Sequence, residues 1–547
     1  MSEDLATLQS VTLDERLVCD LELLLDGSFH PLEGFLNEAD YISVVDKMRL
    51  TSGALWPIPI VLPIDPQTKA RVTSQPKIVL RDPTNLPLAI LHVESIYRPD
   101  LPREWLGVFG TVDDNHPSVG NLAPDVHYIG GKVERLHSVV HYDYRDLRLS
   151  PATVKQFFAD HGWTTVVGFQ TRNPMHRSHY ELSKFALREA GADAHLLLHP
   201  VVGVTQDCDV PYQTRLRCYQ ELLHHYEPGT VKLALLPLAM RMAGPREAVW
   251  HALIRKNYGC THFVIGRDHA GPSYRTKQGA SFYTPYQAQD LLLAHADEIG
   301  IKVIASPEIV YVKELDAYVN ERDLTPAMTP VRLSGTEQRR YLTEGTDIPA
   351  WFSFPGVLAE LRRDYRPLHL RGLCVYFVGL SCSGKSTLAN ALKVRLEELD
   401  RNRRVTLLDG DVVRQFLSKG LGFSKEDRST NVKRIGYVAS EIVHHNGICL
   451  CANIAPYDAD RVANRQLIQQ YGSYVEVYVQ TPVSVCESRD IKGLYKMARQ
   501  GIVKNFTGVD DPFEPPTRAD LVVDHDTTID ATVDKILAHL KSKGLVG

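Results

Sequence analysis

Residues 379–386 read GLSCSGKS, which matches the phosphate-loop pattern G-x-x-x-x-G-K-[ST]. An apolar run at 373–380, typical of a buried strand, precedes the loop, and a helical pattern at 385–399 follows it. Backbone N–H groups and the helix N-terminus would bind phosphate there, Lys385 would reach the outer phosphates, and Ser386 could ligate Mg²⁺. The stretch therefore predicts an α/β domain with a parallel sheet that binds a nucleotide together with Mg²⁺.

Downstream residues narrow the chemistry of this domain. Asp409 and Asp411 end the next predicted strand, where a carboxylate can serve Mg²⁺ or accept a proton from an attacking hydroxyl. Phe423 and Phe506 could stack on a nucleobase, and Arg428 could hold a second anionic nucleotide. Each of these last three has a plainer interpretation, as a core aromatic or a surface charge.

Five segments together resemble the adenylylsulfate (APS) kinase family: GLSCSGKST (379–387), LLDGDVVR (407–414), LGFSKEDRSTN (421–431), KGLYKMAR (492–499) and FTGVDDPFEPP (506–516). The resemblance covers about 372 to the C-terminus and implies transfer of the ATP γ-phosphoryl group to the 3′-hydroxyl of APS, which gives PAPS. It implies that Lys385 and Asp411 are catalytic, with Asp411 as the base. The residues implied to bind ATP are Gly379, Leu380, Ser381, Cys382, Ser383, Gly384, Lys385, Ser386 and Thr387. The residues implied to bind APS are Asp409, Asp411, Arg414, Phe423, Arg428, Asn431, Ile454, Lys492 and Phe506.

The sequence departs from this family's pattern at two positions. Where the family usually reads Ser-Pro-Tyr-Arg, residues 455–458 read Ala-Pro-Tyr-Asp. Ala455 has no hydroxyl, so it cannot be phosphorylated. Asp458 reverses a charge near the implied anion site, which predicts an effect on APS affinity.

A second stretch, FQTRNPMHRSH at 169–179, is rich in hydrogen-bond donors. The Asn-Pro pair at 173–174 predicts a helix start, with Asn as N-cap and Pro in the first helical position. His176 and His179 would then share a face near the positive end of that helix, with Arg172 in the loop before it. Such a pocket suits a polyphosphate, although a capped helix with two structural histidines is the plainer alternative. A zinc site is disfavoured, because no third ligand follows at the usual spacing.

Two further motifs, LAMRMAGPRE (238–247) and GRDHAG (266–271), follow in order. With the first stretch they resemble the ATP sulfurylase (sulfate adenylyltransferase) family, and the segments at 48–64 and 333–352 extend the resemblance over about 1–365. The resemblance implies that ATP and sulfate give APS and pyrophosphate, by attack of sulfate on the α-phosphorus without a covalent nucleophile.

Roles follow from this second resemblance. Gln170, Arg172 and the backbone of Ala270 are implied to hold sulfate. Asn173, His176 and His179 are implied to contact the ATP phosphates, with Arg267 nearby and Arg241 on a mobile loop. The full implied site is Gln170, Thr171, Arg172, Asn173, His176, His179, Arg241, Gly266, Arg267, Asp268, His269 and Ala270, of which Arg172, Asn173, His176, His179 and Arg267 are the expected catalytic residues.

The chain of 547 residues is too long for one core and is expected to form several domains. We expect a mostly β, PUA-like domain at 1–150, a Rossmann-like nucleotidylyltransferase domain at 151–330, a small helical subdomain with linker at 331–365, and a P-loop kinase domain at 372–547. The expected fold class is multidomain α/β, with strands alternating with helices after about 151.

Composition limits the partners and the compartment. The formal net charge of −5 gives no general attraction for nucleic acid, and no apolar run is long enough to span a membrane. The polar N-terminus predicts no signal or transit peptide, and nine scattered cysteines predict neither a disulfide framework nor zinc binding. We expect a cytoplasmic homo-oligomer.

The sequence therefore predicts a bifunctional enzyme of sulfate activation, using ATP, sulfate, APS and pyrophosphate, producing PAPS, and requiring Mg²⁺ with ATP. Two alternatives stay open. The C-terminal unit could bind PAPS for regulation without catalysis, against which the intact Lys385, Ser386 and Asp411 argue. The sulfurylase could also work towards ATP synthesis, because an enzyme accelerates both directions.

Overall fold

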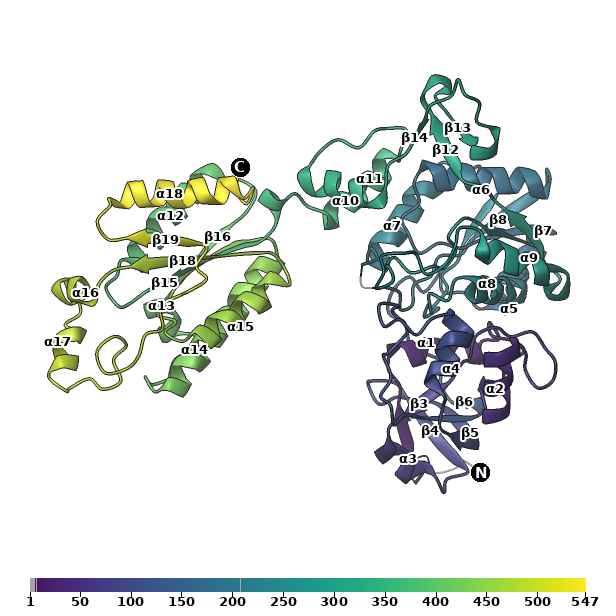
Figure 1. The fold of residues 1–547 in the computed structure, drawn as a ribbon, viewed down its shortest axis with the longest axis horizontal. Helices are drawn as coiled ribbons and strands as arrows, with labels where there is room; N and C mark the ends of the chain where they lie inside the picture. Colours follow the sequence, from purple (N-terminus) through teal and green to yellow (C-terminus); the bar gives the residue numbers. More distant parts are fainter. Residues whose placement is uncertain (1–4, 6, 207) are drawn as a thin grey trace. The chain divides into compact units, whose positions relative to one another are not determined.

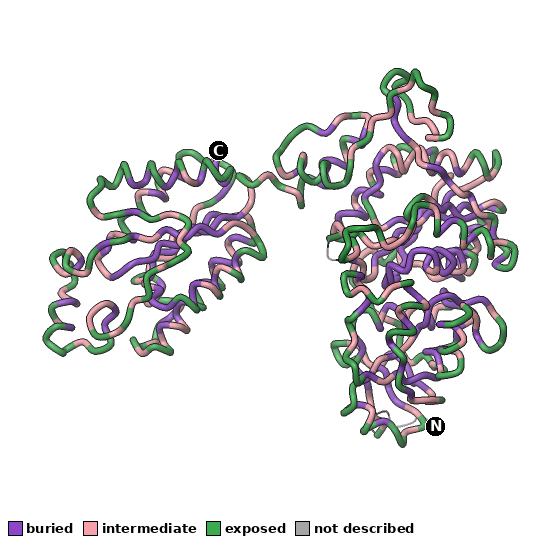
Figure 2. Tube along the Cα trace, viewed as in Figure 1, coloured by how far each residue is buried: buried purple, intermediate pink, exposed green. Residues whose placement is uncertain are grey.

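The computed structural model describes residue 5, residues 7–206 and residues 208–547. The chain forms two compact units, one of Met1–Ser334 with Ile348–Asp364 and the other of Gly335–Asp347 with Tyr365–Gly547 (Figure 1). Each unit has buried strands covered by helices whose outer faces are exposed (Figure 2). We describe each unit by itself.

The first part of unit 1 is a six-stranded sheet of order β1-β4-β5-β6-β2, with β3 paired to β6. All pairs are antiparallel except β1 with β4. Of the apolar run WPIPIVLPI at 56–64, only the last three residues form a strand, because Pro57 and Pro59 have no N–H to donate to a neighbouring strand. The elements are β1 (Ser10–Thr12), α1 (Glu15–Leu25), β2 (Gly34–Phe35), α2 (Glu38–Lys47), β3 (Leu62–Ile64), α3 (Pro66–Val72), β4 (Lys77–Arg81), β5 (Pro87–Tyr97), α4 (Leu101–Phe109) and β6 (His127–Arg135).

A parallel five-stranded sheet of order β11-β10-β7-β8-β9 follows. The chain runs outward from β7 through β8 to β9 and then returns to place β10 on the other side of β7. The sheet therefore has its topological switch point between β7 and β10, where open α/β sheets bind ligands. The elements are α5 (Pro151–Asp160), β7 (Thr165–Phe169), α6 (Arg177–Ala190), β8 (Ala194–Leu198), α7 (Tyr212–Leu223), β9 (Val231–Leu233), α8 (Pro245–Asn257), β10 (His262–Ile265), α9 (Gln287–Ile299) and β11 (Lys302–Ala305).

The predicted start of the helix after β7 is wrong. Helix α6 begins at Arg177 with His176 as its N-cap, not at the Asn-Pro pair. The Asn173 carbonyl already accepts hydrogen bonds from Thr171 Oγ1 (3.0 Å) and Tyr219 Oη (2.7 Å). The Arg177 N–H donates instead to the Phe352 carbonyl (3.1 Å). Residues 171–175 therefore form a loop at the end of β7.

Small elements complete unit 1 and lead to unit 2. Strands β12, β13 and β14 form an antiparallel sheet of order β13-β12-β14. Helix α11 is joined to α7 by an ion pair between Arg217 Nε and Glu360 Oε2 (2.7 Å). The elements are β12 (Ile309–Val312), η1 (Lys313–Leu315), β13 (Ala317–Asn320), η2 (Glu321–Asp323), β14 (Pro330–Val331), α10 (Gly335–Glu344), α11 (Pro355–Asp364) and η3 (Leu368–Leu370).

Unit 2 contains a parallel sheet, as predicted, and this sheet has five strands in the order β16-β17-β15-β18-β19. Every residue of β15 is buried, because alternate side chains pack into separate cores on the two faces of the sheet. Helices α12 and α18 cover one face, and α14 covers the other. The elements are β15 (Leu373–Val378), α12 (Lys385–Leu399), β16 (Val405–Asp409), α13 (Gly410–Gln415), α14 (Lys425–His444), β17 (Ile448–Ala452), α15 (Asp458–Gln469), β18 (Ser473–Gln480), α16 (Val483–Arg489), α17 (Leu494–Arg499), β19 (Leu521–Asp524) and α18 (Ile529–Ser542).

Candidate active sites

The phosphate loop of unit 2 connects β15 to α12. Gly384 is the N-cap of α12 and has a φ of 109°, a left-handed conformation that favours glycine. Lys385 is buried, and its Nζ donates a hydrogen bond to the Leu380 carbonyl across the loop (2.6 Å). Burial lowers the pKa of Lys385 to about 8. The loop therefore holds a buried cation beside the left-handed turn at Gly384, an arrangement that suits an anionic ligand.

We expect ATP binding to this loop to weaken as the pH rises above about 8. Bound phosphate favours the charged form of Lys385, whose pKa in the free protein is about 8. Binding therefore takes up a proton, and each further pH unit costs up to about tenfold in affinity. The check is KM for ATP in PAPS formation between about pH 7 and pH 9.5. Lys385→Arg, whose charge does not titrate there, should flatten the rise. A wild-type KM independent of pH would contradict the assignment.

A cavity of about 610 Å³ opens beside the loop at the carboxyl edge of the sheet. Its lining includes every residue predicted to bind APS: Asp409, Asp411, Arg414, Phe423, Arg428, Asn431, Ile454, Lys492 and Phe506. It also includes the loop residues Ser381, Cys382, Ser383, Gly384, Lys385, Ser386 and Thr387. The two remaining loop residues, Gly379 and Leu380, are outside this lining. The cavity thus joins a phosphate cradle to a second region rich in cations and aromatic rings.

Side chains with oxygen atoms line this cavity beside the phosphate loop. Ser386 Oγ donates to Asp409 Oδ2 (2.6 Å), and Asp409 Oδ1 accepts from the Asp411 N–H (3.0 Å). The Asp411 carboxylate is ion-paired with Lys492. A hydroxyl and a carboxylate held together are the hard oxygen ligands that Mg²⁺ prefers, so Ser386 and Asp409 fit the expected ion.

Aromatic rings and arginines form the second region. Phe423 is 56% exposed, and the Arg414 guanidinium lies 4.3 Å from its ring centroid. Phe506 is buried and packs edge-on against Tyr495 (centroids 4.9 Å apart), so it serves the core and the cavity wall together. Arg428 is buried, and its Nε donates to the Phe423 carbonyl (2.9 Å). Burial lowers the pKa of Arg428, although Asp511 partly opposes this effect.

Residues that we did not predict also line this cavity. Several of them come from the end of α16 to the start of α17 and from the end of β19 to α18: Arg489, Ile491, Leu494, Asp524, His525, Thr527, Ile529 and Thr532. Arg489 Nη1 donates to the Cys382 carbonyl of the phosphate loop (3.3 Å). The only signal in the sequence was the polar run DHDTT at 524–528, directly after a short apolar strand.

In unit 1, the loops after β7 and β10 meet at the switch point. The Arg172 guanidinium donates to Asp209 Oδ1 (2.5 Å) and to the Gly271 carbonyl (3.1 Å). The Gly244 N–H donates to the Ala270 carbonyl (3.2 Å), which joins the second motif to the third. The three motifs, far apart in sequence, are therefore in direct contact.

The histidine pair begins α6 beside this loop. The His176 N–H donates to His179 Nδ1 (3.3 Å), which leaves the ring proton of a neutral His179 on Nε2. Burial lowers the pKa of His179 to about 4, so the ring is neutral at pH 7. His176 is buried, packs on Phe352 and lies 2.9 Å from Ser353 Oγ through Nδ1. Both a structural and a ligand-binding role fit these contacts.

The loop after β10 has an unusual backbone. Asp268 and Ala270 both have a φ of 54°, which is uncommon for residues with a Cβ and is often found at functional sites. Arg267 and Asp268 are exposed, and Arg267 is paired with Glu308 (2.9 Å) and with Asp268 (3.2 Å). Gly266 and His269 are half-buried and Ala270 is buried.

The structure does not place Arg241 on an exposed loop, as the expectation of a mobile segment implied. Its side chain is 2% exposed and forms an ion pair with Asp20 of α1 (2.5 Å). The charge of Arg241 is therefore paired inside the fold of unit 1. The Arg246 guanidinium of the same motif is also bound within the fold, since its Nη1 and Nη2 donate to the Val44 and Val45 carbonyls (3.0 and 2.9 Å).

Comparison with known proteins agrees with both halves of this description. A PUA-like domain model matches residues 1–138, an ATP-sulfurylase model matches 145–364, and an adenylylsulphate kinase model matches 371–524. A sulfate adenylyltransferase of Emericella nidulans is 46% identical over 551 residues, covering 100% of this chain and 95% of that protein. One of Phaeosphaeria nodorum is 45% identical over 545 residues, covering 98% of this chain and 94% of its own.

The chain belongs to the sulfate adenylyltransferase family. It is an enzyme with a nucleotidyltransferase domain and a kinase domain, and both resemblances seen in the sequence are confirmed. A solved structure described as a hexameric APS kinase from Thiobacillus denitrificans superimposes with a TM-score of 0.78 at 32% identity, covering 100% of this chain and 95% of that one. The predicted multidomain α/β fold is confirmed along the whole chain.

The two departures of this family member from the APS kinase pattern lie outside the cavity lining. Ala455 is fully buried. Asp458 begins α15, where a carboxylate is favoured by the helix dipole, and it is paired with Arg461 (2.9 Å). The reversed charge at 458 is therefore neutralised by a neighbouring arginine.

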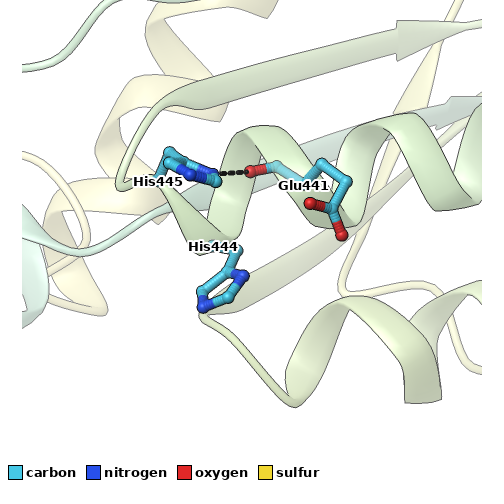
Figure 3. A group of neighbouring side chains, drawn as sticks. All are labelled: Glu441, His444 and His445. Atoms are coloured by element: carbon cyan, nitrogen blue, oxygen red, sulfur yellow. Dashed lines mark hydrogen bonds between the residues drawn. The ribbon is translucent and has the colours of Figure 1, made fainter. Parts of the chain in front are cut away.

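One group among the described residues has the spacing of a metal site: Glu441, His444 and His445, at the C-terminal end of α14 (Figure 3). His445 Nδ1 donates to the Glu441 carbonyl (2.9 Å), which caps the helix. The group is about 15 Å along the helix axis from Asn431, which lines the cavity. It has no part in the cavity of this sulfate adenylyltransferase. None of the described helices combines the length and the apolar character needed to cross a membrane.

Proposed function

We propose that this enzyme performs two successive steps of sulfate activation. In unit 1, ATP and sulfate give APS and pyrophosphate, and in unit 2, APS and a second ATP give PAPS and ADP. The observation that carries the proposal is one cavity of unit 2, which joins seven of the nine phosphate-loop residues to all the residues expected to bind APS. A module that only senses PAPS would not need the Ser386–Asp409 pair.

Two groups of lining residues suggest how the two nucleotides are arranged. The group of Arg489, His525 and Thr527 suits the base of ATP, with its phosphates over the loop. The group of Arg414, Phe423 and Arg428 suits the anionic nucleotide APS, with Phe423 against its base. In this arrangement the ribose of APS faces the outer phosphate of ATP across the carboxylates.

Phosphoryl transfer would then depend mainly on positioning and charge. Asp411 accepts the proton of the attacking 3′-hydroxyl, and Lys492, its partner in the structure, holds that carboxylate in place. The Lys385 ammonium group would stabilise the negative charge that develops on the transferred phosphoryl group. Mg²⁺ bound with ATP would add charge neutralisation, with Ser386 and Asp409 as its protein ligands.

In unit 1 the difficulty is electrostatic, because a sulfate dianion must approach a polyanion. Arg172 lies at the switch point between β7 and β10 and would hold sulfate with Gln170 and the Ala270 backbone. His179 would donate Nε2–H to the ATP phosphates beside Asn173 and His176. Preorganised donors of this kind stabilise charge on the leaving pyrophosphate without a covalent intermediate.

The test uses the purified full-length protein with ATP, Mg²⁺ and labelled sulfate, resolving APS from PAPS over time. Label should pass through APS into PAPS. Label that stops at APS, also when APS itself is supplied, would favour the regulatory alternative. ATP formation from APS and pyrophosphate, measured in the same preparation, reports on the reverse direction.

We further propose a cytoplasmic homo-oligomer. All nine cysteines lack disulfide partners, which is usual in a reducing compartment. The hexameric relative matches this chain along its whole length, and light scattering of the purified protein would give the assembly state.

Replacing His176 and His179 by alanine should lower the rate of ATP formation from APS and pyrophosphate by about 10²–10³-fold. The change removes donors from the N-terminus of α6, where phosphate charge would develop. The matched control is His224→Ala, an exposed histidine of the same unit. A folded double variant that works at the wild-type rate would show that the pair is structural.

A further inference from the structure

A buried polar face on α8 joins the three sulfurylase motifs. Glu247, His251 and Arg255 follow at four-residue spacing and so share one face of the helix, and all three are 0% exposed. Burying such groups costs free energy unless each has a hydrogen-bond partner. The face therefore depends on the neighbours that it contacts.

His251 is the centre of these contacts, although it belongs to none of the three motifs. Its Nδ1 lies 3.0 Å from Nε2 of His269, in the loop after β10. Its Nε2 lies 3.4 Å from Glu247 Oε1, in the second motif, and 3.4 Å from the side-chain amide of Gln170, in the first. The His251 ring thus contacts two residues that were predicted to bind ligand, His269 through Nδ1 and Gln170 through Nε2.

The surroundings of His251 decide which nitrogen carries its proton. Glu247 accepts the Arg241 N–H on Oε1 (3.0 Å) and the Ala243 N–H on Oε2 (2.7 Å), so it acts as an acceptor. An acceptor beside Nε2 favours a proton there. Gln170 Oε1 is buried without a partner, and exchanging the amide oxygen and nitrogen would give that proton a second acceptor. Nδ1 of His251 then carries no proton and accepts a hydrogen bond from Nε2–H of His269.

The same reasoning fixes His269. Burial lowers the pKa of both rings well below the usual value, so each is neutral and carries one proton. With that proton on Nε2, the Nδ1 of His269 is a hydrogen-bond acceptor. The ring is half-buried and packs edge-on against Phe263 (centroids 5.8 Å apart), between the left-handed residues Asp268 and Ala270.

We propose that His251 is a positioning residue of the sulfurylase reaction, which sets the orientation and tautomer of His269 so that its Nδ1 accepts an N–H or O–H group of the nucleotide. The inference rests on the proposed function of unit 1. It gives Glu247 and Gln170 the role of orienting His251 from behind.

Three variants separate the two nitrogens of His251, measured by kcat/KM for APS in ATP formation with excess pyrophosphate. His251→Asn keeps an amide near Nδ1 and can still accept from His269, whereas His251→Gln places its amide near Nε2, and His251→Leu keeps neither. The leucine and glutamine variants should lose about 10²-fold, the usual scale for misplaced reacting groups, and asparagine should restore at least about tenfold of that loss. Equal losses for asparagine and glutamine would overturn the proposal.

A double-mutant cycle with His269→Ala supplies the second measurement. If His251 acts through His269, His251→Leu should cost less than about twofold once His269 is already alanine. Additive losses would show that His251 serves packing alone and would overturn the proposal. PAPS formation by unit 2 and the thermal unfolding midpoint of each variant report whether the chain has folded.

The wild-type protein separates this inference from the function on which it rests. If it forms no ATP from APS and pyrophosphate and no APS from ATP and sulfate, the proposed function of unit 1 fails and this inference fails with it. If the wild type is active and all His251 variants match it, only the role of His251 is refuted.

Discussion

Lys385→Ala should lower the rate of PAPS formation by about 10²–10³-fold and leave the rate of APS formation unchanged. The side chain is buried in the phosphate loop, where its Nζ donates a hydrogen bond to the Leu380 carbonyl. Alanine removes the cation that would stabilise the negative charge on the transferred phosphoryl group. The residues expected to bind sulfate and ATP in the first reaction all belong to unit 1. The measurement is the rate of each step with its own substrates supplied.

A matched control lies two helical turns further along α12. Lys393→Ala removes a partly exposed lysine whose partner is Glu397 (3.6 Å), and it should change neither rate. If Lys385→Ala removed both activities from a folded protein, the model of two separate sites would be wrong. If it removed neither, the phosphate loop of unit 2 would not be catalytic.

Local patterns predicted some elements to the residue and missed others. Helix α12 was expected at 385–399 and runs from Lys385 to Leu399, because the phosphate-loop motif itself fixes where the helix begins. The start of α6 was predicted three residues early. The Asn-Pro pair has good capping chemistry, but the Asn173 carbonyl is taken by Tyr219, a residue of another helix. A single sequence gives no sign of such a tertiary hydrogen bond.

The candidate sites show the same division between motif and tertiary contact. Motif resemblance predicted the residues of the unit 2 cavity that are expected to bind APS, but it did not predict Arg489 or His525, which line the same cavity, because their local sequence patterns are weak. Arg241 was identified by its motif, yet its pairing with Asp20 depends on how α1 packs against the parallel-sheet domain. Glu247, His251 and Arg255 do show four-residue spacing in the sequence. That spacing alone does not distinguish a buried polar face from a solvated one.

The second large effect is expected from Asp411→Asn, which should lower PAPS formation by about 10²–10⁴-fold while APS binding changes little. Asparagine keeps the shape of the side chain but cannot accept the proton of the 3′-hydroxyl. It also removes the charge that pairs with Lys492, so a modest change in APS affinity is expected as well. The measurement is kcat for PAPS formation by the full-length protein, with APS binding followed separately.

This substitution distinguishes a kinase from a module that only binds PAPS. The control is Asp534→Asn on α18, an exposed carboxylate paired with Arg395 (3.0 Å), which should leave the rate unchanged. A binding module would make no PAPS in the wild type, and Asp411→Asn would then alter only the affinity for PAPS.

The next residue to test would be Asp458, one of the two positions that depart from the APS kinase pattern. Because Asp458 is paired with Arg461 and is not part of the cavity lining, we expect Asp458→Asn to change the rate of PAPS formation less than about threefold. If the rate of PAPS formation fell with Asp458→Asn but not with Asp411→Asn, the catalytic centre would lie away from the phosphate loop. That result would contradict the arrangement proposed for the two nucleotides.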